Sequence, residues 1–422
     1  MLVKLIYAAL MGAQIGLILK RPAALLGLGI SVYAVAFWSA SLDPFFAKSY
    51  GVTNVTFVLI GLFAVAIHIQ REGFSDLFKI GPAAWLLVSL LVLSFASVFW
   101  SISTDYALEQ FGKTMPKLLA FSILLPIVLA RPSQIHFGLV VAAIFSGVVL
   151  WLYMAMAFTS GRWVVSNSGQ SFGNPLAIAS LGGVVAIIGS TVRVRRVGTL
   201  VIPIRIGLVI LGLSAIIFVD TRGQLIAAGI VILTVTPLAI GGTNFKALAG
   251  KVLVPILFIV PTALVILNIT SESARFDPLN MIQEYDGSRL VFVKLALQYW
   301  VNAGPAAWLI GIGSTACFSP EVVGFYPHFV IVEVLVELGL LGLAIWLTSL
   351  GLTVRSGLRL LRVTAAHPEY RSAIAALGGL FLFYFILSFK QGSLLGSHEL
   401  AFMMILVSRM DTYGLQRDLE SG

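Results

Sequence analysis

Charged residues and cysteine are both scarce in this sequence. Only 11% of its 422 residues are charged, whereas a soluble domain carries about 25%, and this deficit excludes an ordinary soluble enzyme. Cys317 is the only cysteine, so no intrachain disulfide can form and the fold does not depend on an oxidising compartment. Apolar side chains make up 59% of the chain instead, and the mean hydropathy is +1.00.

Long apolar runs recur along the whole chain. Most have about 17 to 22 residues, enough for a helix to cross ~30 Å of hydrocarbon, and they are continuous, which argues against a transmembrane barrel. We predict spans at 2–19, 22–41, 52–70, 82–100, 117–130, 138–158, 175–191, 200–219, 223–240, 250–268, 328–352 and 373–389, with a shorter run at 397–410. The sequence therefore predicts an all-α polytopic integral membrane protein with 12 to 13 transmembrane helices.

The longest polar stretch lies before the third-last predicted helix. We expect three parts: a transmembrane helix bundle at 1–268, a large, partly helical periplasmic loop at 269–327, and C-terminal transmembrane helices with a short cytoplasmic tail at 328–422. Alternating the connecting segments puts 17 of the 27 Lys and Arg residues on one side of the membrane and 10 on the other. The positive-inside rule makes the first side cytoplasmic, which places the 269–327 loop outside.

The basic clusters at 193–196 and 355–371 fall on the predicted cytoplasmic side. We interpret them as determinants of orientation rather than as ligand sites. Because topology accounts for the placement of the positive charge, the formal net charge of +9 does not indicate a nucleic-acid partner.

Arg222 lies in the sequence Asp220-Thr-Arg-Gly223, a turn so short that two apolar runs nearly fuse around it. An ionisable group at the edge of the hydrocarbon is costly unless it pairs or binds an anion, and the guanidinium fork suits phosphate oxygens. Either a salt bridge to Asp220 or an anionic ligand would satisfy it. Gly223 permits close approach of another group.

Arg289 follows Ser288, a predicted N-cap, and begins a stretch whose apolar residues repeat at helical spacing up to Trp300. Such a helix would lie on or near the membrane surface. An arginine in the first turn opposes the helix dipole by about 0.3–1 kcal/mol. A bound anion would offset that cost; the alternative is a solvated surface arginine.

His328 opens the next apolar run, and Glu333 and Glu337 follow on one helix face. Imidazole is the side chain best suited to proton transfer near neutral pH, although a lone histidine at a helix start is more often structural. We interpret Glu337 as a packing or hydrogen-bonding group between helices, with Gly339 and Gly342 allowing close approach.

Several groups of residues that would indicate other chemistry are missing. The sequence has no HExxH, no cysteine pair and no DxD, and its five histidines are His68, His136, His328, His367 and His398. We therefore expect no metal. A glycine-rich phosphate loop is also missing, so we expect no cofactor, and the energy must come from the substrate or from a gradient.

Short motifs follow one another through the middle of the chain. They are Ser97-Val-Phe-Trp-Ser101 with Asp105-Tyr-Ala-Leu, Phe172-Gly-Asn-Pro175, Thr221-Arg-Gly223, Ser288-Arg289, Gly311-Ile-Gly313, His328 and Glu337-Leu-Gly-Leu-Leu-Gly342. In this order they resemble the O-antigen ligase and O-antigen polymerase superfamily, bacterial inner-membrane enzymes that transfer glycans from an undecaprenyl-pyrophosphate carrier. The resemblance covers roughly residues 97–345, and Phe329 stands where the family usually has an asparagine.

This resemblance implies a metal-independent glycosyltransferase with its active site facing the periplasm. The donor is an undecaprenyl-pyrophosphate-linked glycan, and the acceptor is lipid A-core or another lipid-linked glycan. The arginines bind the pyrophosphate and the histidine acts on the acceptor hydroxyl. The implied catalytic residues are His328, Arg222 and Arg289; further substrate-binding residues are Arg162, Lys113 and Lys117; supporting residues are Glu337, Asp220 and Asn174.

Three alternatives remain open at this point. Phe329 slightly favours a polymerase of O-antigen or exopolysaccharide over a ligase. A secondary transporter would instead use Glu333 and Glu337 for ion coupling. A scaffold of an envelope assembly complex would need none of these residues for catalysis.

Overall fold

The structure is a computed structural model that describes residues 50–159, 175–194, 201–219, 221–240, 289–325, 327–390 and 393–414, with isolated residues before position 50. Within these ranges the chain is built from helices and turns and contains no strand, so the predicted all-α class is confirmed. The predicted spans at 2–19, 22–41 and 250–268 lie wholly or mostly outside the described residues.

The helices follow the apolar runs. They are α4 (Tyr50–Glu72), α5 (Pro82–Ala96), α6 (Thr104–Lys117), α7 (Leu125–Leu129), α8 (Pro132–Thr159), α9 (Pro175–Thr191), α10 (Val201–Phe218), α11 (Arg222–Ile240), α14 (Arg289–Asn302), α15 (Pro305–Ile310), α16 (Val330–Val363), α17 (Pro368–Ser388) and α18 (His398–Arg409). In the described part of the chain, six helical segments are long and apolar enough to cross a membrane, namely those containing α5, α8, α10, α11, α16 and α17. These segments support a membrane protein, and α9 is apolar but shorter.

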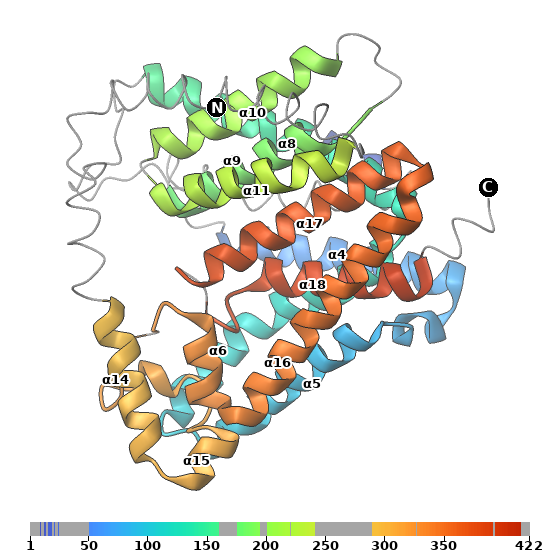
Figure 1. Ribbon diagram of the computed structural model, residues 1–422. Helices are drawn as coiled ribbons and strands as arrows, with labels where there is room; N and C mark the ends of the chain where they lie inside the picture. The colour runs from blue at the N-terminus through green and yellow to red at the C-terminus, as the bar shows by residue number, and fades with distance from the viewer. Residues whose placement is uncertain are drawn as a thin grey trace.

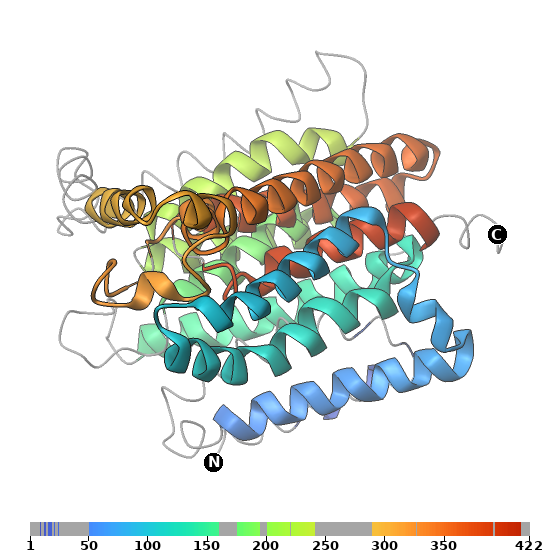
Figure 2. The same cartoon turned by 90° about the horizontal axis from the view of Figure 1, so that it is seen from below.

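The long helices lie side by side in a bundle. Figure 1 shows α16 beside α5 and α17 beside α11, and these pairs pack against each other. Both cartoon views place α14 and α15 together at one end (Figures 1 and 2), which we call the α14 end of the bundle. The turn before α16, the end of α17 and the starts of α11 and α18 lie toward this end.

Two helical segments are longer than the apolar pattern predicts. The predicted span at 328–352 is α16, which continues to Val363 because its later turns carry basic side chains and need no hydrocarbon around them. The 14-residue run at 117–130 is the second half of a longer helical path, in which α6 leads through a π-helix (Leu118–Leu124) into α7. Because the turns of α6 are polar, the hydropathy pattern did not predict that α6 and α7 belong to one helical path.

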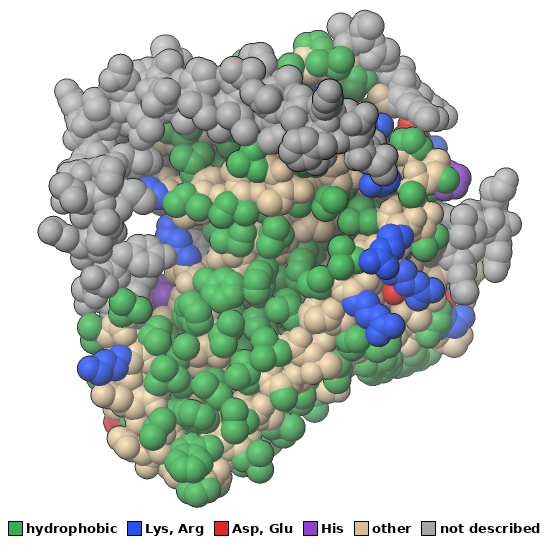
Figure 3. All heavy atoms as spheres, in the orientation of Figure 1, with side chains coloured by type: hydrophobic (Ala, Val, Ile, Leu, Met, Phe, Trp, Pro, Cys, Tyr) green, Lys and Arg blue, Asp and Glu red, His purple; other side chains and the backbone are tan. Residues whose placement is uncertain are grey.

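The main apolar core lies between the long helices, with Trp346, Phe383 and Phe402 among its largest buried side chains. Gly182 of α9 and Gly212 of α10 let these two helices meet closely, since a Cβ atom on Gly182 would lie 2.5 Å from the carbonyl oxygen of Gly212. Figure 3 shows apolar side chains over much of the face that contains α16 and α17, as expected where helices contact lipid.

A smaller core attaches α14 and α15 to the bundle. It contains Ala296 of α14, Ala307 of α15, Cys317 of the following loop, and Val332 and Val336 of α16. The predicted partly helical loop before the third-last helix is thus packed against α16 over its described part, from Arg289 onward.

Candidate functional site

His328 lies in the turn that precedes α16, and its side chain is half-buried. Its backbone φ is 57°, in the left-handed region that residues with a Cβ seldom adopt. Its ring lies 5.2 Å from the ring of Phe325 and 6.5 Å from that of Phe292, measured between centroids. Residues held in this region cluster at functional sites, so the geometry supports a functional role for the histidine.

Phe292 contacts His328 and lies on the helix that begins with Arg289. Arg289 is the first residue of α14, and Phe292 lies one turn later on the same helix. Because residues three apart share a helix face, the ring contact between Phe292 and His328 places the first turn of α14 beside the histidine. The side chain of Arg289 itself is not among the side chains that the structure describes.

Phe329, which replaces the family's usual asparagine, is a packing residue. Its ring meets that of Phe389 edge-on, with centroids 5.1 Å apart and an interplanar angle of 68°, an arrangement worth about 0.5–1.5 kcal/mol beyond the buried area. Phe389 immediately follows α17. This contact joins the segment that carries His328 to the end of α17.

Arg222 begins α11 and is half-buried. The next residue, Gly223, contacts Lys390, which follows α17: a Cβ atom built on Gly223 would lie 2.6 Å from the Nζ atom of Lys390. Since Phe389 and Lys390 are adjacent, the end of α17 touches both the segment that carries His328 and the first turn of α11. The structure thus brings His328, Arg222 and the start of α14 to the α14 end of the bundle. Figure 3 shows histidine and basic side chains close together at one edge of the molecule, near this end.

The Glu337 carboxylate holds the loop that precedes α16. Its Oε2 accepts a hydrogen bond from the backbone N–H of Thr315 (2.8 Å) and its Oε1 accepts one from Cys317 (3.3 Å). Its backbone carbonyl accepts a third, from Gly313 (3.0 Å). Burial, reinforced by the nearby Glu337 carboxylate, raises the pKa of the Cys317 thiol well above its ordinary value.

A group of serines, of which only Ser97 and Ser101 belong to a motif quoted above, attaches the same loop to the end of α5. Ser94 and Ser314 share a hydrogen bond between their hydroxyls (2.8 Å), the N–H of Ser314 donates to Ser97 (2.9 Å), and the hydroxyl of Ser101 donates to the carbonyl of Ser314 (2.8 Å). The sequence spacing indicates that these serines can act together, because positions 94, 97 and 101 fall on one helical face.

Glu333 is buried, with 3% of its surface exposed. Its Oε1 accepts a hydrogen bond from the backbone N–H of Leu394 (3.1 Å), in the turn between α17 and α18. Its Oε2 is buried and has no hydrogen-bond partner among the described residues. Glu333 therefore joins the first turns of α16 to the segment that also contains Lys390.

The remaining predicted site residues are not brought to His328 by the described contacts. Lys113 lies on the surface of α6, is 63% exposed and forms an ion pair with Glu109, one turn earlier. The side chain of Lys117, at the end of α6, and residues Arg162, Asn174 and Asp220 lie outside the described residues. Their predicted roles stay predictions.

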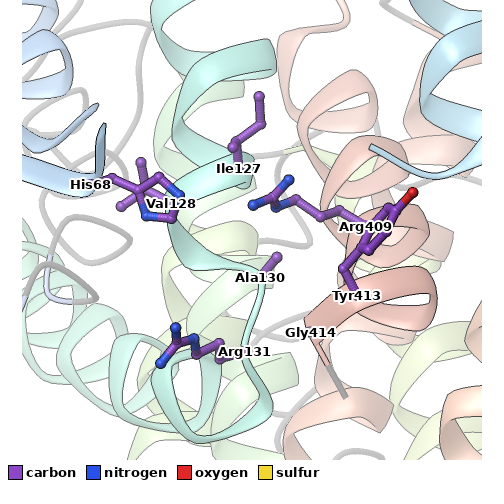
Figure 4. A pocket seen from close by; sticks show the side chains of 8 residues that line it. All are labelled: His68, Ile127, Val128, Ala130, Arg131, Arg409, Tyr413 and Gly414. Atoms are coloured by element: carbon purple, nitrogen blue, oxygen red, sulfur yellow. The ribbon is translucent and has the colours of Figure 1, made fainter. Parts of the chain in front are cut away.

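The end of the bundle opposite the α14 end contains a small cavity between described residues. This cavity of about 20 Å³ is lined by His68, Arg131, Arg409 and Tyr413 (Figure 4). Arg409 is only 4% exposed and donates to the Oδ2 atom of Asp76 (2.5 Å) and to backbone carbonyls of Asp76 and Lys79. Arg409 is one of the 17 basic residues predicted to lie on the cytoplasmic side, and its position in the last apolar run indicates that it is buried and paired.

Among the residues that the structure describes, no group of three or more His, Cys, Asp and Glu side chains is arranged to hold a metal ion. The α14 end instead gathers an imidazole, a guanidinium, an ammonium group and buried carboxylates that hydrogen-bond backbone amides. Such a set can bind an anion and move a proton.

The described residues form an all-helical bundle with six segments long and apolar enough to cross a membrane, and one end of this bundle contains a candidate anion-binding site. A comparison with models of known protein families found no match, and a comparison with curated proteins found none either. The O-antigen ligase and polymerase superfamily therefore stays a resemblance carried by the motifs.

Proposed function

We propose that this chain is a membrane glycosyltransferase of the O-antigen ligase and polymerase type. It moves a glycan from an undecaprenyl-pyrophosphate carrier to an acceptor hydroxyl. The observation that supports this most is the meeting of three segments distant in sequence at the α14 end: the turn of His328, the first turn of α14 and the first turn of α11. These segments carry the histidine and the two arginines that the family's motifs contain.

The proposed reaction needs only groups that these segments supply. The acceptor oxygen attacks the anomeric carbon of the donor sugar and forms the new glycosidic bond. The bond from that carbon to the pyrophosphate oxygen breaks, and its electron pair leaves with the carrier pyrophosphate. His328 takes the proton of the acceptor hydroxyl, and Arg222 and Arg289 stabilise the charge that grows on the leaving group.

The membrane placement is part of the proposal. We propose 12 to 13 transmembrane helices in the bacterial inner membrane, with the α14 end facing the periplasm. Basic residues late in α16, among them Arg355, Arg359 and Arg362, lie at the opposite end, where Figure 3 shows a group of basic side chains. That placement supports the proposed orientation, because positive residues favour the cytoplasmic side.

The identity of the acceptor distinguishes a ligase from a polymerase. Phe329 packs on Phe389 and offers no hydrogen bond in the place of the family asparagine, which favours a polymerase of O-antigen or exopolysaccharide. In that case the acceptor is a second lipid-linked glycan rather than lipid A-core.

Reconstitution tests the proposal. Purified protein in proteoliposomes receives an undecaprenyl-pyrophosphate glycan together with lipid A-core or with more of the lipid-linked glycan. We expect a ladder of lengthening lipid-linked glycans, which identifies a polymerase. A shifted lipid A-core band would identify a ligase, and no product from either authentic acceptor would contradict the proposal.

A secondary transporter is the second candidate, and Glu333 is the observation that favours it. A buried carboxylate with one oxygen lacking a hydrogen-bond partner among the described residues is typical of an ion pathway. Glu337, in contrast, uses both oxygens to hold backbone amides of a loop, which suits a structural role. Uptake driven by a proton or sodium gradient into the same proteoliposomes, abolished by Glu333→Gln, would establish the transporter.

A further inference from the structure

We propose that a row of aromatic rings leading to His328 binds the sugar rings of the acceptor glycan. The row consists of Tyr106 on α6, Phe318 and Phe325 in the segment before α16, and the imidazole of His328 itself. The choice of a glycan as the ligand rests on the proposed function, because a glycosyltransferase needs an acceptor saccharide beside its catalytic histidine. The row gives the site a surface for that acceptor, in addition to the groups proposed to bind pyrophosphate and to move a proton.

The rings of the row follow one another in contact. The centroids of Tyr106 and Phe318 are 5.1 Å apart, those of Phe318 and Phe325 are 6.4 Å apart, and those of Phe325 and His328 are 5.2 Å apart. Aromatic rings in contact have centroids about 4.5–7 Å apart, so none of the three steps leaves a gap. The row therefore extends from the surface of α6 to the imidazole that is proposed to act on the acceptor hydroxyl.

Tyr106 and Phe325 also present part of their rings at the surface, since Tyr106 is 36% exposed and Phe325 is 44% exposed. Tyr106 faces water rather than lipid, because Asp105 and Glu109 on the same helix are exposed as well and charged side chains are costly in hydrocarbon. Contact with membrane lipid therefore does not account for this exposed ring. Apolar surface that faces water beside a proposed active site is typical of a binding surface.

The side chains around the row suit a saccharide. One face of a pyranose ring carries C–H groups, which pack on the negative face of an aromatic ring, whereas its hydroxyls need hydrogen-bond donors and acceptors. Glu109 and Lys113 lie three and seven residues after Tyr106, on the same face of α6, and form an exposed ion pair. The phenolic hydroxyl of Tyr106 can donate and accept. This mixture of rings and polar groups matches a glycan better than an acyl chain, which has no hydroxyls to satisfy.

Hydrogen bonds hold the first two rings of the row in a fixed relation. The hydroxyl of Ser101, three residues before α6, donates to the carbonyl of Ser314 (2.8 Å). The N–H of Phe318 donates to the carbonyl of Thr315 (3.0 Å), the residue after Ser314. The segments that carry Tyr106 and Phe318 are thus joined to each other before any ligand arrives. A preorganised surface of this kind loses little conformational entropy on binding.

The chain offers matched aromatic variants for the test. Tyr106→Ala removes the ring farthest from His328, and Tyr106→Phe keeps that ring while removing its hydroxyl. Phe325→Ala and Phe325→Tyr form the second pair. Phe78→Ala is the control: Phe78 is 56% exposed and its ring contacts that of Phe74 (5.5 Å between centroids), but both lie in the short helix Phe74–Phe78 near Arg409, at the opposite end of the bundle.

The measurement is a saturation-transfer NMR titration of the full-length protein in nanodiscs. The probe is the soluble glycan that mild acid releases from the lipid-linked glycans of the bacterium that produces this protein, and a melting curve confirms that each variant folds. We expect Tyr106→Ala and Phe325→Ala each to raise Kd about three- to tenfold. We expect Tyr106→Phe, Phe325→Tyr and Phe78→Ala to stay within about twofold of the parent, because each keeps the rings of the row.

Three results would overturn the proposal. They are an unchanged Kd for either folded alanine variant of the row, an equal loss for Phe78→Ala, and no saturation transfer from the parent protein to the glycan. The last result would mean that the exposed rings contact a protein partner instead.

Glycan transfer separates this proposal from the proposed function. Glycan binding that depends on Tyr106 in a protein that transfers no glycan would support the binding surface while refuting the glycosyltransferase. In an active protein we expect Tyr106→Ala to raise the KM for the acceptor more than it lowers kcat. Transfer by Tyr106→Ala with an unchanged acceptor KM would support the glycosyltransferase and refute the binding surface.

Discussion

At the scale of single residues, the Glu337 side chain accepts hydrogen bonds from two backbone amides of the loop that precedes α16. Both amides belong to buried residues, Thr315 and Cys317, so no solvent replaces the carboxylate if it is removed. The side chain therefore fixes the loop that leads toward His328, and removing it should lower the free energy of unfolding.

Glu337→Ala leaves two buried N–H groups without an acceptor, at a cost of about 1–3 kcal/mol each. We expect a clearly lower melting temperature in detergent. Glu337→Gln keeps one acceptor oxygen and should lose about half as much. A Glu337→Ala protein that melts with the parent would show that these hydrogen bonds do not hold the loop.

Sequence reasoning identified His328, Arg222 and Glu337 because their residue types are conspicuous in apolar surroundings. It considered Glu337 as a hydrogen-bonding group, and the structure supplies the amides that it binds. The contact between Lys390 and Gly223 was not predictable, because no local pattern connects residues that are 167 positions apart in the sequence.

At the scale of elements, glycines determine how closely the loop of residues 311–317 packs on α5 and α16. Gly313 has a φ of 96°, and a Cβ atom there would lie 2.6 Å from the backbone nitrogen of Ser101. Gly339 interrupts α16 with a φ of 67°, and its Cβ would lie 2.6 Å from the backbone nitrogen of Gly311. Both glycines therefore allow close packing, as the sequence predicted for Gly339.

Gly313→Ala should therefore lower the free energy of unfolding by more than the strain of a positive φ alone would. Gly304 is the control, because its φ is also positive, at 90°, but no atom lies within 4 Å of its Cβ position. We expect Gly304→Ala to cost about 1–2 kcal/mol and Gly313→Ala distinctly more, as measured by thermal unfolding. Equal losses would mean that the collision with Ser101 is relieved without cost.

Hydropathy located the long helices well, because crossing hydrocarbon requires an unbroken apolar run. The hydropathy pattern did not predict the C-terminal end of α16 or the continuous path from α6 to α7, since those turns are polar. The contacts of α14 with His328 also needed the structure, because a surface helix does not reveal which turn it packs against.

At the scale of the whole molecule, the proposed orientation places the two ends of the bundle on opposite sides of the membrane. Leu309 of α15 is 59% exposed at the α14 end, and Val363, the last residue of α16, is 44% exposed at the other. In a Cys317→Ser background, a membrane-impermeant maleimide applied to intact spheroplasts should label Leu309→Cys and leave Val363→Cys unlabelled. The reverse pattern would place the α14 end in the cytoplasm.

The most direct measurement compares the rate of glycan transfer by His328→Ala with that of His367→Ala in the same proteoliposomes. His367 is an exposed histidine at the opposite end of the bundle, so it controls for the loss of an imidazole as such. Removing a general base lowers a rate by about 10²–10⁴-fold, and we expect a loss in this range for His328→Ala with an unchanged melting temperature and no loss for His367→Ala. Transfer by folded His328→Ala at the parental rate would contradict a catalytic site at the α14 end.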